Sequence, residues 1–422
     1  MSAALKPTKA LIAHASETLS DVLRFSGPAD QAVSRHFRNN RELGQQDRAF
    51  VAETVFAALR RRRSLAIAAQ SESPYSLVLA VLVRLHGLSV RTVADAVREK
   101  DVPLLERARA GRTEDQSPAV QADLPDWLWD RLVAQQGEAE AMAIARGMLA
   151  AAPMDLRVNA VKASRESVLA SLRSAGIAGE PTPYSPTGIR LSEKPAINRH
   201  PAYVDGSVEV QDEGSQLLAF VAGAKRGEMV VDFCAGGGGK TLALGAMMRN
   251  TGRLYAFDVS AKRLAGLDPR LARSGLSNVH PIAISTENDL RAKRLAGKID
   301  RVLVDAPCSG FGTLRRNPDL KWRFGEKDVA ELLEKQSRIL AAAARLPRVG
   351  GRLVYATCSV LREEGEDIVA KFLAAHTGYG QVSCAEILAA QGISLDTGMN
   401  LRVYPHVHGT DGFFAAAFER KS

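Results

Sequence analysis

Residues 229–241 have the sequence MVVDFCAGGGGKT, in which an apolar run ends in an aspartate and four glycines precede a lysine and a threonine. The apolar run Met229–Phe233 is typical of a buried strand, Gly236–Gly239 predict a tight turn, and Lys240–Met248 have a helical composition. Glycines let a ligand approach the backbone closely, and the N-terminus of a helix offers unpaired N–H groups. The stretch therefore predicts a strand, a ligand-binding turn and a helix in succession.

The same alternation of strands and helices continues toward the end of the chain. Strand patterns recur at Arg253–Asp258, Ile299–Asp305, Arg352–Thr357 and Gly412–Phe418, with helical segments between them. This alternation is typical of a doubly wound, mostly parallel sheet, in which ligands bind at the carboxyl ends of the strands. We therefore expect an α/β domain of this class over residues 206–422.

Two further domains are expected upstream. Residues 1–138 have mainly helical patterns and abundant Ala, Leu and Arg, which predicts an all-helical domain. Residues 139–205 combine strand patterns at Met154–Asn159 and Gly188–Leu191 with a helical pattern at Arg165–Gly176. These predict a small α+β linker domain between the helical domain and the α/β domain.

Composition narrows the class of protein. The chain of 422 residues is longer than one hydrophobic core usually organises, and its net charge of +9 points toward polyanionic partners. The run Arg60–Arg63 fits a solvated helix end as well as a contact with RNA phosphates. No apolar stretch approaches the roughly 20 residues of a membrane helix, and the N-terminus has no signal-peptide core. We expect a cytoplasmic protein with no membrane partner, and its four cysteines are too few for a disulfide scaffold.

The glycine turn departs from both common nucleotide-binding motifs. A Walker loop, GxxxxGK[ST], requires glycine where Cys234 stands, and the dinucleotide fingerprint GxGxxG requires glycine at Thr241. Asp258, which ends the next predicted strand, has the position that holds ribose hydroxyls in nucleotide-binding folds. S-adenosylmethionine (SAM), which has no phosphate, fits this combination better than NAD. An oxidoreductase or NTPase is disfavoured without being excluded, and a tight structural turn beside a solvated aspartate is a further alternative.

Two cysteines follow two other predicted strands. They lie in the segments VDAPCSG (304–310) and YATCS (355–359), so both thiols can face one cleft of the same sheet. A single cysteine after a strand is more often a small buried residue than a nucleophile. Two at the ligand edge, one of them preceded by Asp-Ala-Pro, favour a chemical role. Cys384 lies outside any motif and is expected to be structural.

These three segments, in this order, resemble the NOL/NOP/Sun family of RNA cytosine-5 methyltransferases, most closely its bacterial Fmu/RsmB branch, which modifies small-subunit ribosomal RNA. The resemblance covers Val208–Phe418, and DAPCSG and ATCS are its specific motifs. It implies a Rossmann-like, SAM-dependent methyltransferase domain over residues 206–422. Members of this branch also carry a NusB-like helical RNA-binding domain and a small α+β region, which are similar in architecture to residues 1–205.

The resemblance implies a role for each motif residue. Carbon 5 of cytosine is too weak a nucleophile to take the methyl group directly, and attack by a thiolate at carbon 6 makes carbon 5 electron-rich. The family's nucleophile is the TCS cysteine, here Cys358. The DAPC motif supplies Asp305, which hydrogen-bonds the N3 and amino edge of the base, and Cys308, which serves product release. Lys240 matches a lysine beside the methyl donor and the base.

A SAM site is implied by the same resemblance. Relatives usually have Ala-Pro-Gly-Gly in the turn, and the loss of the proline is expected to loosen this loop. A third acidic contact is expected within Ser285–Asp289, where Glu287 is chosen. The residues expected to bind SAM are Cys234, Ala235, Gly236, Gly237, Gly238, Gly239, Lys240, Asp258, Glu287 and Asp305.

A basic segment follows the DAPC motif. Cations hold phosphates and an aromatic side chain can stack on a base, although a buried tryptophan with a basic rim is the alternative. The residues expected to bind RNA are Arg315, Arg316, Lys321, Trp322 and Arg323. The target cytosine is expected to be unpaired or extruded from its stack.

The sequence thus predicts an enzyme that acts as a monomer on RNA, with ribosomal RNA favoured, SAM as cofactor and no metal ion. One alternative keeps this chemistry and replaces the substrate by transfer RNA. Another is a non-catalytic RNA-binding protein of ribosome assembly with a methyltransferase fold. That alternative predicts a lost nucleophile or a broken donor loop. This sequence instead retains the candidate nucleophile and an intact donor loop.

Overall fold

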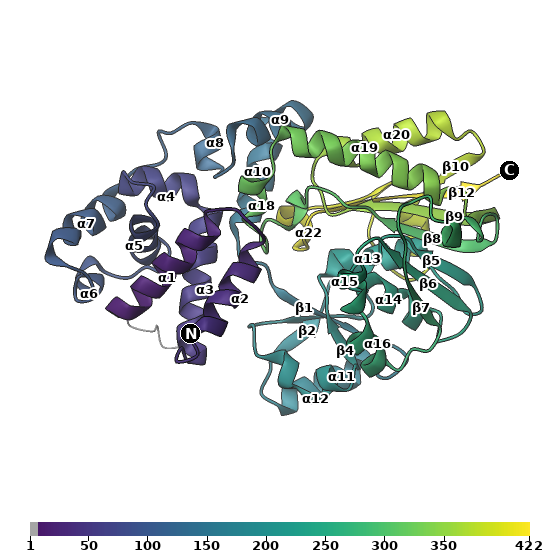
Figure 1. Ribbon diagram of the computed structural model, residues 1–422, viewed down its shortest axis with the longest axis horizontal. Coiled ribbons are helices and arrows are strands. Elements are labelled where there is room, and N and C mark those ends of the chain that lie inside the picture. Colours follow the sequence, from purple (N-terminus) through teal and green to yellow (C-terminus); the bar gives the residue numbers. More distant parts are fainter. Residues whose placement is uncertain (1–6) are drawn as a thin grey trace. The chain divides into compact units, whose positions relative to one another are not determined.

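The computed structural model describes residues 7–422, which form two compact units (Figure 1). The first unit runs to Ala151 and includes Thr313–Glu326, and the second consists of Ala152–Gly312 and Lys327–Ser422. The expected helical domain 1–138 begins with six residues that lie outside the described part. The expected catalytic domain 206–422 contains the segment Thr313–Glu326, which packs with the first unit.

The first unit is all-helical. Leu77–Val83 of its central helix are all buried, because that helix is apolar on every side and other helices surround it. The helix begins at Pro74 behind Ser73, whose hydroxyl accepts the N–H of Ser76 (3.2 Å). The helices are α1 (Lys9–Val22), α2 (Ala29–Asn39), α3 (Gln45–Arg60), α4 (Arg62–Ala69), α5 (Pro74–Arg84), α6 (Val90–Ala94), η1 (Glu99–Asp101), α7 (Val102–Ala110), α8 (Pro118–Gln121), α9 (Asp126–Gln136), α10 (Glu138–Leu149) and α18 (Leu320–Arg323).

The second unit begins with a small antiparallel sheet. Its strand order is β2-β3-β1-β4, and Leu156 of β1 pairs with Ile189 on one side and Val210 on the other. The two strands and the helix expected here are present, and two strands not expected complete the sheet. The elements are β1 (Met154–Val158), α11 (Arg165–Ser174), β2 (Gly179–Pro181), β3 (Gly188–Leu191), η2 (Ile197–Arg199), α12 (Pro201–Val204) and β4 (Val208–Val210).

The rest of the second unit is a doubly wound α/β fold, as expected. In the described part of the chain eight strands form its sheet, in the order β10-β12-β9-β8-β5-β6-β7 with β11 beside β12. The elements are α13 (Glu213–Ala222), β5 (Met229–Asp232), α14 (Gly239–Met247), β6 (Arg253–Asp258), α15 (Ala261–Ala265), α16 (Asp268–Ser274), β7 (Val279–Ala283), α17 (Leu290–Lys293), β8 (Ile299–Asp305), η3 (Phe311–Thr313), α19 (Glu326–Ala343), β9 (Pro347–Thr357), η4 (Arg362–Glu364), α20 (Glu366–Ala375), β10 (Tyr379–Val382), α21 (Cys384–Ala389), β11 (Leu401–Val403), α22 (Pro405–His408) and β12 (Phe413–Arg420).

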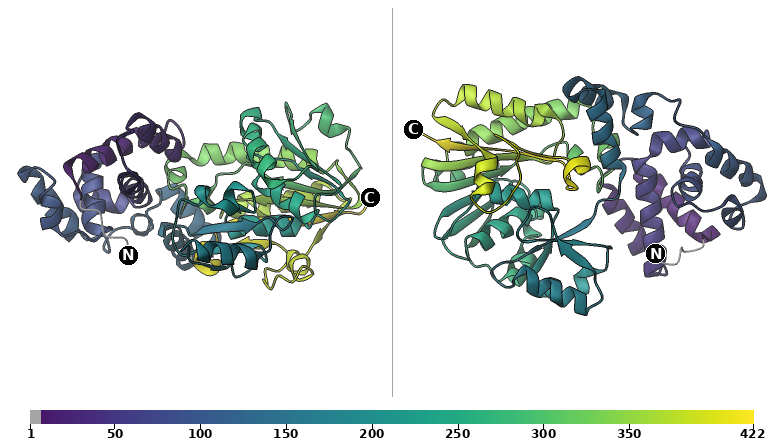
Figure 2. Two further views of the ribbon diagram at one scale, coloured as in Figure 1. Left: turned by 90° about the horizontal axis from the view of Figure 1, so that it is seen from below. Right: turned by 180° about the vertical axis from the view of Figure 1, so that it is seen from behind.

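Helices cover both faces of this sheet (Figures 1 and 2). Apolar residues of α13, α14 and α21 pack on one face, and those of α19 and α20 pack on the other. Strands β7, β6, β5, β8 and β9 are parallel, and the chain order reverses between β5 and β8. Ligands bind doubly wound sheets at such a reversal, outside the carboxyl ends of the strands. The fold therefore places the expected motifs at the carboxyl ends of the strands, where this class of fold usually binds its ligands.

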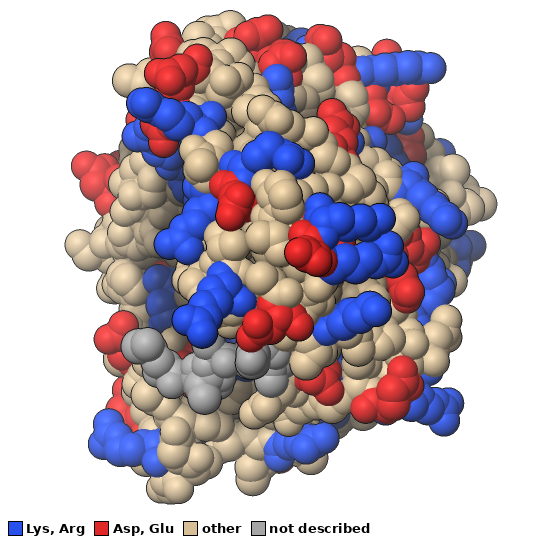
Figure 3. Space-filling view, turned by 90° about the vertical axis from the view of Figure 1, so that its left-hand side faces the viewer, with Lys and Arg blue, Asp and Glu red and all other residues tan. Residues whose placement is uncertain are grey.

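Two surface properties bear on possible partners. Among residues 7–422 no single helix is long and apolar enough to cross a membrane, although α4 and α5 pass the length and composition criteria together across a 95° bend. On the face shown in Figure 3, Lys and Arg are interspersed with Asp and Glu. The net positive charge is therefore not gathered into one area on that face.

Candidate functional site

A cavity of about 480 Å³ opens at the carboxyl ends of β5, β6, β8 and β9. All of its lining residues belong to the second unit. Of the expected catalytic and SAM-binding residues, those that line it are Cys234, Ala235, Gly236, Gly237, Gly239, Lys240, Asp258, Glu287, Asp305, Cys308 and Cys358. The fold thus brings together residues that are up to 124 positions apart in the chain, from Cys234 to Cys358.

The glycine turn forms one wall of this cavity. Gly236 and Gly238 have φ of +55° and +81°, a left-handed conformation that favours glycine. Gly238 does not line the cavity, and a Cβ atom there would lie 2.2 Å from Leu267. This glycine is therefore required for packing behind the loop rather than for contact with a ligand.

Asp258 holds the turn from the neighbouring strand. Its carboxylate is buried and accepts the N–H of Gly236 (2.8 Å), the N–H of Ser260 (2.7 Å) and the guanidinium of Arg263 (3.0 Å). The side chain expected to bind ribose hydroxyls is therefore fixed by three donors before any ligand arrives.

Two arginines that the sequence analysis did not identify hold the turn through its carbonyl groups. Arg270 donates to the Gly237 oxygen (2.5 Å), and Arg157 of β1 donates to the Gly239 oxygen (2.6 Å). Glu209 of β4 anchors Arg270 through two hydrogen bonds (2.9 and 3.1 Å). Burial lowers the pKa of Arg157 to about 10, so it stays charged at neutral pH. The loop that lacks a proline is thus tied from outside by the small sheet and α16.

A half-buried ion pair lies next to the turn. Lys240 donates to the Asp305 carboxylate (2.7 Å), and its amine lies 5.7 Å from the centre of the Phe413 ring. Burial lowers the pKa of the Lys240 amine, but the Asp305 carboxylate outweighs burial and raises it. Lys240 is therefore a permanent cation beside the carboxylate expected to contact the base.

Asp232, at the end of β5, also lines the cavity and was not predicted. One carboxylate oxygen accepts the Thr241 hydroxyl (2.7 Å), whereas Oδ1 is buried without a hydrogen-bond partner in the described part of the chain. Burial raises the pKa of this carboxyl to about 7. An unpartnered acceptor of this kind is suited to a ligand that brings a cation or a strong donor.

The two motif cysteines meet in the cavity. The sulfur atoms of Cys308 and Cys358 lie 3.3 Å apart, because β8 and β9 are parallel neighbours in which Asp305 is opposite Ala356. The hydrogen bond with Cys358, followed by burial, raises the pKa of Cys308 well above its usual value. Cys308 therefore keeps its proton and can donate it toward the Cys358 sulfur.

Glu364 supports both cysteine loops and was not identified from the sequence. It is 0% exposed, and its carboxylate accepts the N–H and the hydroxyl of Ser309 (2.8 and 2.5 Å) and the amide of Gln336 (2.9 Å). The Tyr355 hydroxyl donates to the Glu364 carbonyl oxygen (2.9 Å). The residue after Cys308 is thus fixed to the segment that follows Cys358.

The remaining acidic candidate for SAM binding lines the cavity, and the two other cysteines of the chain are both at least partly buried. Glu287 lines the cavity and lies 3.5 Å from Arg338, whereas Asp289 caps α17 and pairs with Arg291. Burial, followed by the charge of Asp232, raises the pKa of Cys234 well above its usual value. Cys384 is buried as expected, and its sulfur lies 3.7 Å from the Ala415 carbonyl oxygen.

None of the residues expected to bind RNA lines the cavity, and all five lie in the segment Thr313–Glu326, which belongs to the helical unit. Lys321 is 3% exposed and donates to the carbonyl oxygens of Arg60 (2.8 Å) and Asp123 (2.6 Å). Trp322 packs against the helical core, and its indole N–H donates to the Leu59 carbonyl oxygen (2.8 Å). Burial lowers the pKa of Lys321 to about 7. For Lys321 the structure therefore favours the alternative, a basic side chain buried beside the tryptophan, whereas Trp322 is half-buried and stays an expected RNA contact.

The remaining cations of this segment and of the arginine run are also partly engaged within the helical unit. Arg315 is buried, and its carbonyl oxygen accepts two hydrogen bonds from Arg60 (3.1 and 3.0 Å). Arg63 donates to Asp126 (2.7 Å), and Arg323 pairs with Asp319 (3.1 Å). Arg316 is half-buried and, like Arg323, stays an expected RNA contact.

Comparison with known proteins finds close relatives. Residues 219–419 match the family described as 16S rRNA methyltransferase RsmB/F, and residues 124–198 match the ferredoxin-like domain of RsmF/B-like methyltransferases. The chain is 31% identical to a probable ribosomal RNA small subunit methyltransferase B of Synechocystis sp., over 95% of this chain and 97% of that protein. It is 36% identical to the ribosomal RNA small subunit methyltransferase B of Sodalis glossinidius, over 71% and 69%. The crystal structure of PH0851 superposes with a TM-score of 0.79 at 25% identity, over 98% of this chain and 99% of that one.

Proposed function

Because this chain belongs to the RsmB/F family of 16S rRNA methyltransferases, we propose that it methylates carbon 5 of a cytosine in small-subunit ribosomal RNA. As a member of this family, the chain is a SAM-dependent ribosomal RNA methyltransferase. One observation supports the finer proposal, which is that carbon 5 of the cytosine is methylated through a covalent intermediate. Two thiols lie 3.3 Å apart beside Asp305, in the cavity that the glycine turn lines.

The residues of the cavity fit SAM, which when bound supplies an electrophilic methyl group on its sulfonium sulfur. Oδ1 of Asp232, which has no hydrogen-bond partner among residues 7–422, suits the methionyl ammonium, and Asp258 suits the ribose hydroxyls. Val259 and Ile284 offer apolar surface for the adenine, with Glu287 at its edge. SAM has no phosphate, so the site needs no phosphate-binding cation, and Lys240 is instead paired with Asp305.

The two thiols divide the work of the covalent step. The Cys358 thiolate attacks carbon 6 of the cytosine, which forms the S–C6 bond and moves electron density to carbon 5. The raised pKa of Cys308 keeps that neighbour protonated, so its S–H stabilises the Cys358 thiolate before attack. Asp305 hydrogen-bonds the N3 and amino edge of the base, and Lys240 balances its charge.

Release reverses the first bond. After methylation, water accepts the proton from carbon 5, the electron pair of that C–H bond forms the C5–C6 double bond, and the S–C6 bond breaks to restore the Cys358 thiolate. Cys308 assists this elimination from its position 3.3 Å away. Glu364 keeps that position by fixing Ser309, the residue next to Cys308. The site thus performs attack and release with two different thiols.

A labelling experiment tests the proposal. The protein is incubated with methyl-labelled SAM and, separately, with small-subunit ribosomal RNA and with transfer RNA, and the RNA is digested to nucleosides. We expect label in 5-methylcytosine from the ribosomal RNA. Label in 5-methylcytosine only from transfer RNA would retain the chemistry and discard the substrate. Label in another nucleoside would contradict the proposed chemistry.

A further inference from the structure

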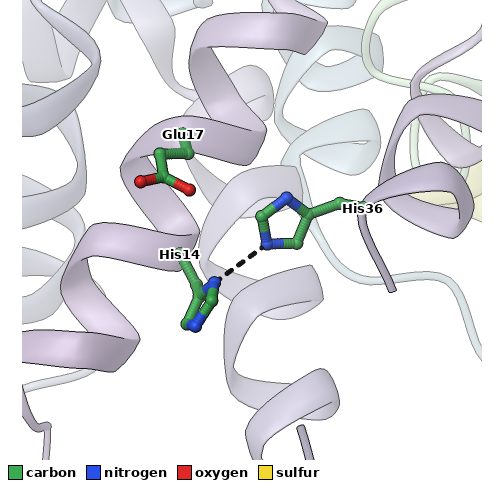
Figure 4. A group of neighbouring side chains, drawn as sticks. All are labelled: His14, Glu17 and His36. Carbon is green, nitrogen blue, oxygen red and sulfur yellow. Dashed lines mark hydrogen bonds between the residues drawn. The ribbon is translucent and has the colours of Figure 1, made fainter. Parts of the chain in front are cut away.

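In the helical unit, three potential metal ligands converge between two helices (Figure 4). His14 and Glu17 are three residues apart on α1, so they share one face of that helix, and His36 comes from α2. Figure 4 shows the rings of His14 and His36 directed at each other across the space between the helices. One ligand atom from each of the three residues lies within 4.8 Å of the others.

The spacing of the two histidines suits a shared ion. His14 Nδ1 and His36 Nε2 are 3.1 Å apart. Two imidazole nitrogens bound to one tetrahedral Zn²⁺, each at about 2.0–2.1 Å, are separated by about 3.3 Å. Binding therefore requires the two nitrogens to separate by only a few tenths of an ångström, together with a rotation of the rings that turns both nitrogens toward the ion. Glu17 is exposed, so its carboxylate is free to rotate toward the same point.

The charge of the cluster also suits a cation. Three carboxylates act on His36, those of Glu17, Glu42 and Asp21. Asp21 is paired with Arg35 (2.5 Å), which leaves Glu17 and Glu42 as a local acidic surplus.

We propose that His14, Glu17 and His36 bind one zinc ion, which joins α1 to α2 in the helical unit. Two nitrogens and one carboxylate oxygen form a ligand set that zinc prefers, and water fills the fourth position. The sequence predicts no metal ion, and the two histidines, 22 positions apart, form no ligand-spacing motif that would have indicated one. The inference is independent of the proposed methyltransferase chemistry.

Zinc titration of the chelator-treated full-length protein tests the site. We expect one zinc ion per chain at this site, an affinity lowered at least about 100-fold by His14→Ala or His36→Ala, and about 10-fold by Glu17→Gln. His280→Ala is the matched control, because His280 is an exposed histidine on β7, and it should leave the affinity unchanged. Because Glu17 is exposed, loss of affinity in Glu17→Gln reports ligation rather than misfolding.

The cysteines of the catalytic cavity are a competing zinc site, so a spectroscopic measurement separates the two. With Co²⁺ in place of zinc, the His–Glu site gives d–d bands without thiolate charge transfer, and those bands should disappear in the His14→Ala/His36→Ala double variant. An unchanged zinc affinity in that double variant would overturn the proposal. A wild-type protein that binds no zinc, or binds it only with thiolate charge-transfer bands when Co²⁺ is substituted, would also overturn it.

Discussion

The sulfur atoms of Cys308 and Cys358 lie 3.3 Å apart, although 50 residues separate them in the chain. They meet because each closely follows a strand, Cys308 three residues after β8 and Cys358 directly after β9, and these two strands are parallel neighbours. Hydrogen bonding and burial raise the pKa of Cys308, so the pair holds a protonated thiol beside the sulfur proposed to attack. The pair therefore offers one group for attack and another for release.

Replacement of the proposed nucleophile should abolish turnover. In Cys358→Ala we expect methyl transfer to fall by more than about 10³-fold, because Cys308, the other thiol beside the base, keeps its proton and is a poor nucleophile. SAM affinity, measured by calorimetry, should stay within about two-fold, since Asp258 and the glycine turn are untouched. Cys384→Ala is the control, because that thiol belongs to the core, and it should keep its activity. Methylation retained in Cys358→Ala would refute the assignment.

Removal of the Glu364 carboxylate should misplace the Cys308 loop. In Glu364→Ala we expect kcat to fall about 10- to 100-fold, because Ser309 and Gln336 lose their common acceptor and the loop shifts. SAM affinity should not change, and Glu364→Gln, which keeps an acceptor oxygen, should recover most of the activity. Glu363→Ala is the neighbouring control. Equal kcat values for Glu364→Ala and the wild type would show that the carboxylate does not position the loop.

Loss of the Arg270 tether should weaken SAM binding. Its bond to the Gly237 carbonyl oxygen holds a turn that contains four glycines and no proline. In Arg270→Ala we expect the Kd of SAM to rise about ten-fold, which corresponds to about 1.4 kcal/mol. Arg273→Ala is the matched control, because Arg273 shares the anchor Glu209 but donates to no carbonyl of the turn. A similar rise in both variants would attribute the effect to Glu209 rather than to the tether.

The affinity for SAM should depend on pH through Asp232. Burial raises the pKa of this carboxyl to about 7, and an ammonium group bound at Oδ1 would lower it again, so binding releases a proton. SAM should therefore bind more tightly as pH rises from about 5.5 to about 6.5, a range in which an α-amino group, with a pKa of about 7.7–8.0, still keeps its charge. Calorimetry should show this dependence in the wild type and not in Asp232→Asn. The same slope in both proteins would exclude Asp232 as its source.

The catalytic motifs could be predicted from the sequence because the ends of parallel strands meet. Asp258, Asp305, Cys308 and Cys358 each follow or end a predicted strand, and the structure brings all four to one cavity. The supports of the site could not be predicted. Arg157 is 82 residues from the Gly239 carbonyl that it holds, and no local pattern records such a contact.

The function of the basic segment 315–323 could not be predicted from the sequence, for a different reason. Four cations and a tryptophan in nine residues are as compatible with an RNA surface as with packing between helices. The difference depends on whether the Lys321 amine finds carbonyl partners, and here Arg60 and Asp123 supply them. A group that satisfies its hydrogen bonds inside the protein loses little by leaving water, so burial is tolerated.

The most direct test of the account is to trap the covalent intermediate. Cys308→Ser, incubated with SAM and small-subunit ribosomal RNA, should permit attack but hinder release, and thus accumulate a protein–RNA adduct that survives denaturation. After digestion, mass spectrometry should find the methylated cytosine attached to the peptide that contains Cys358, and no adduct should form in the Cys308→Ser/Cys358→Ala double variant. A Cys308→Ser protein that turns over freely without an adduct, or an adduct on another residue, would contradict the account.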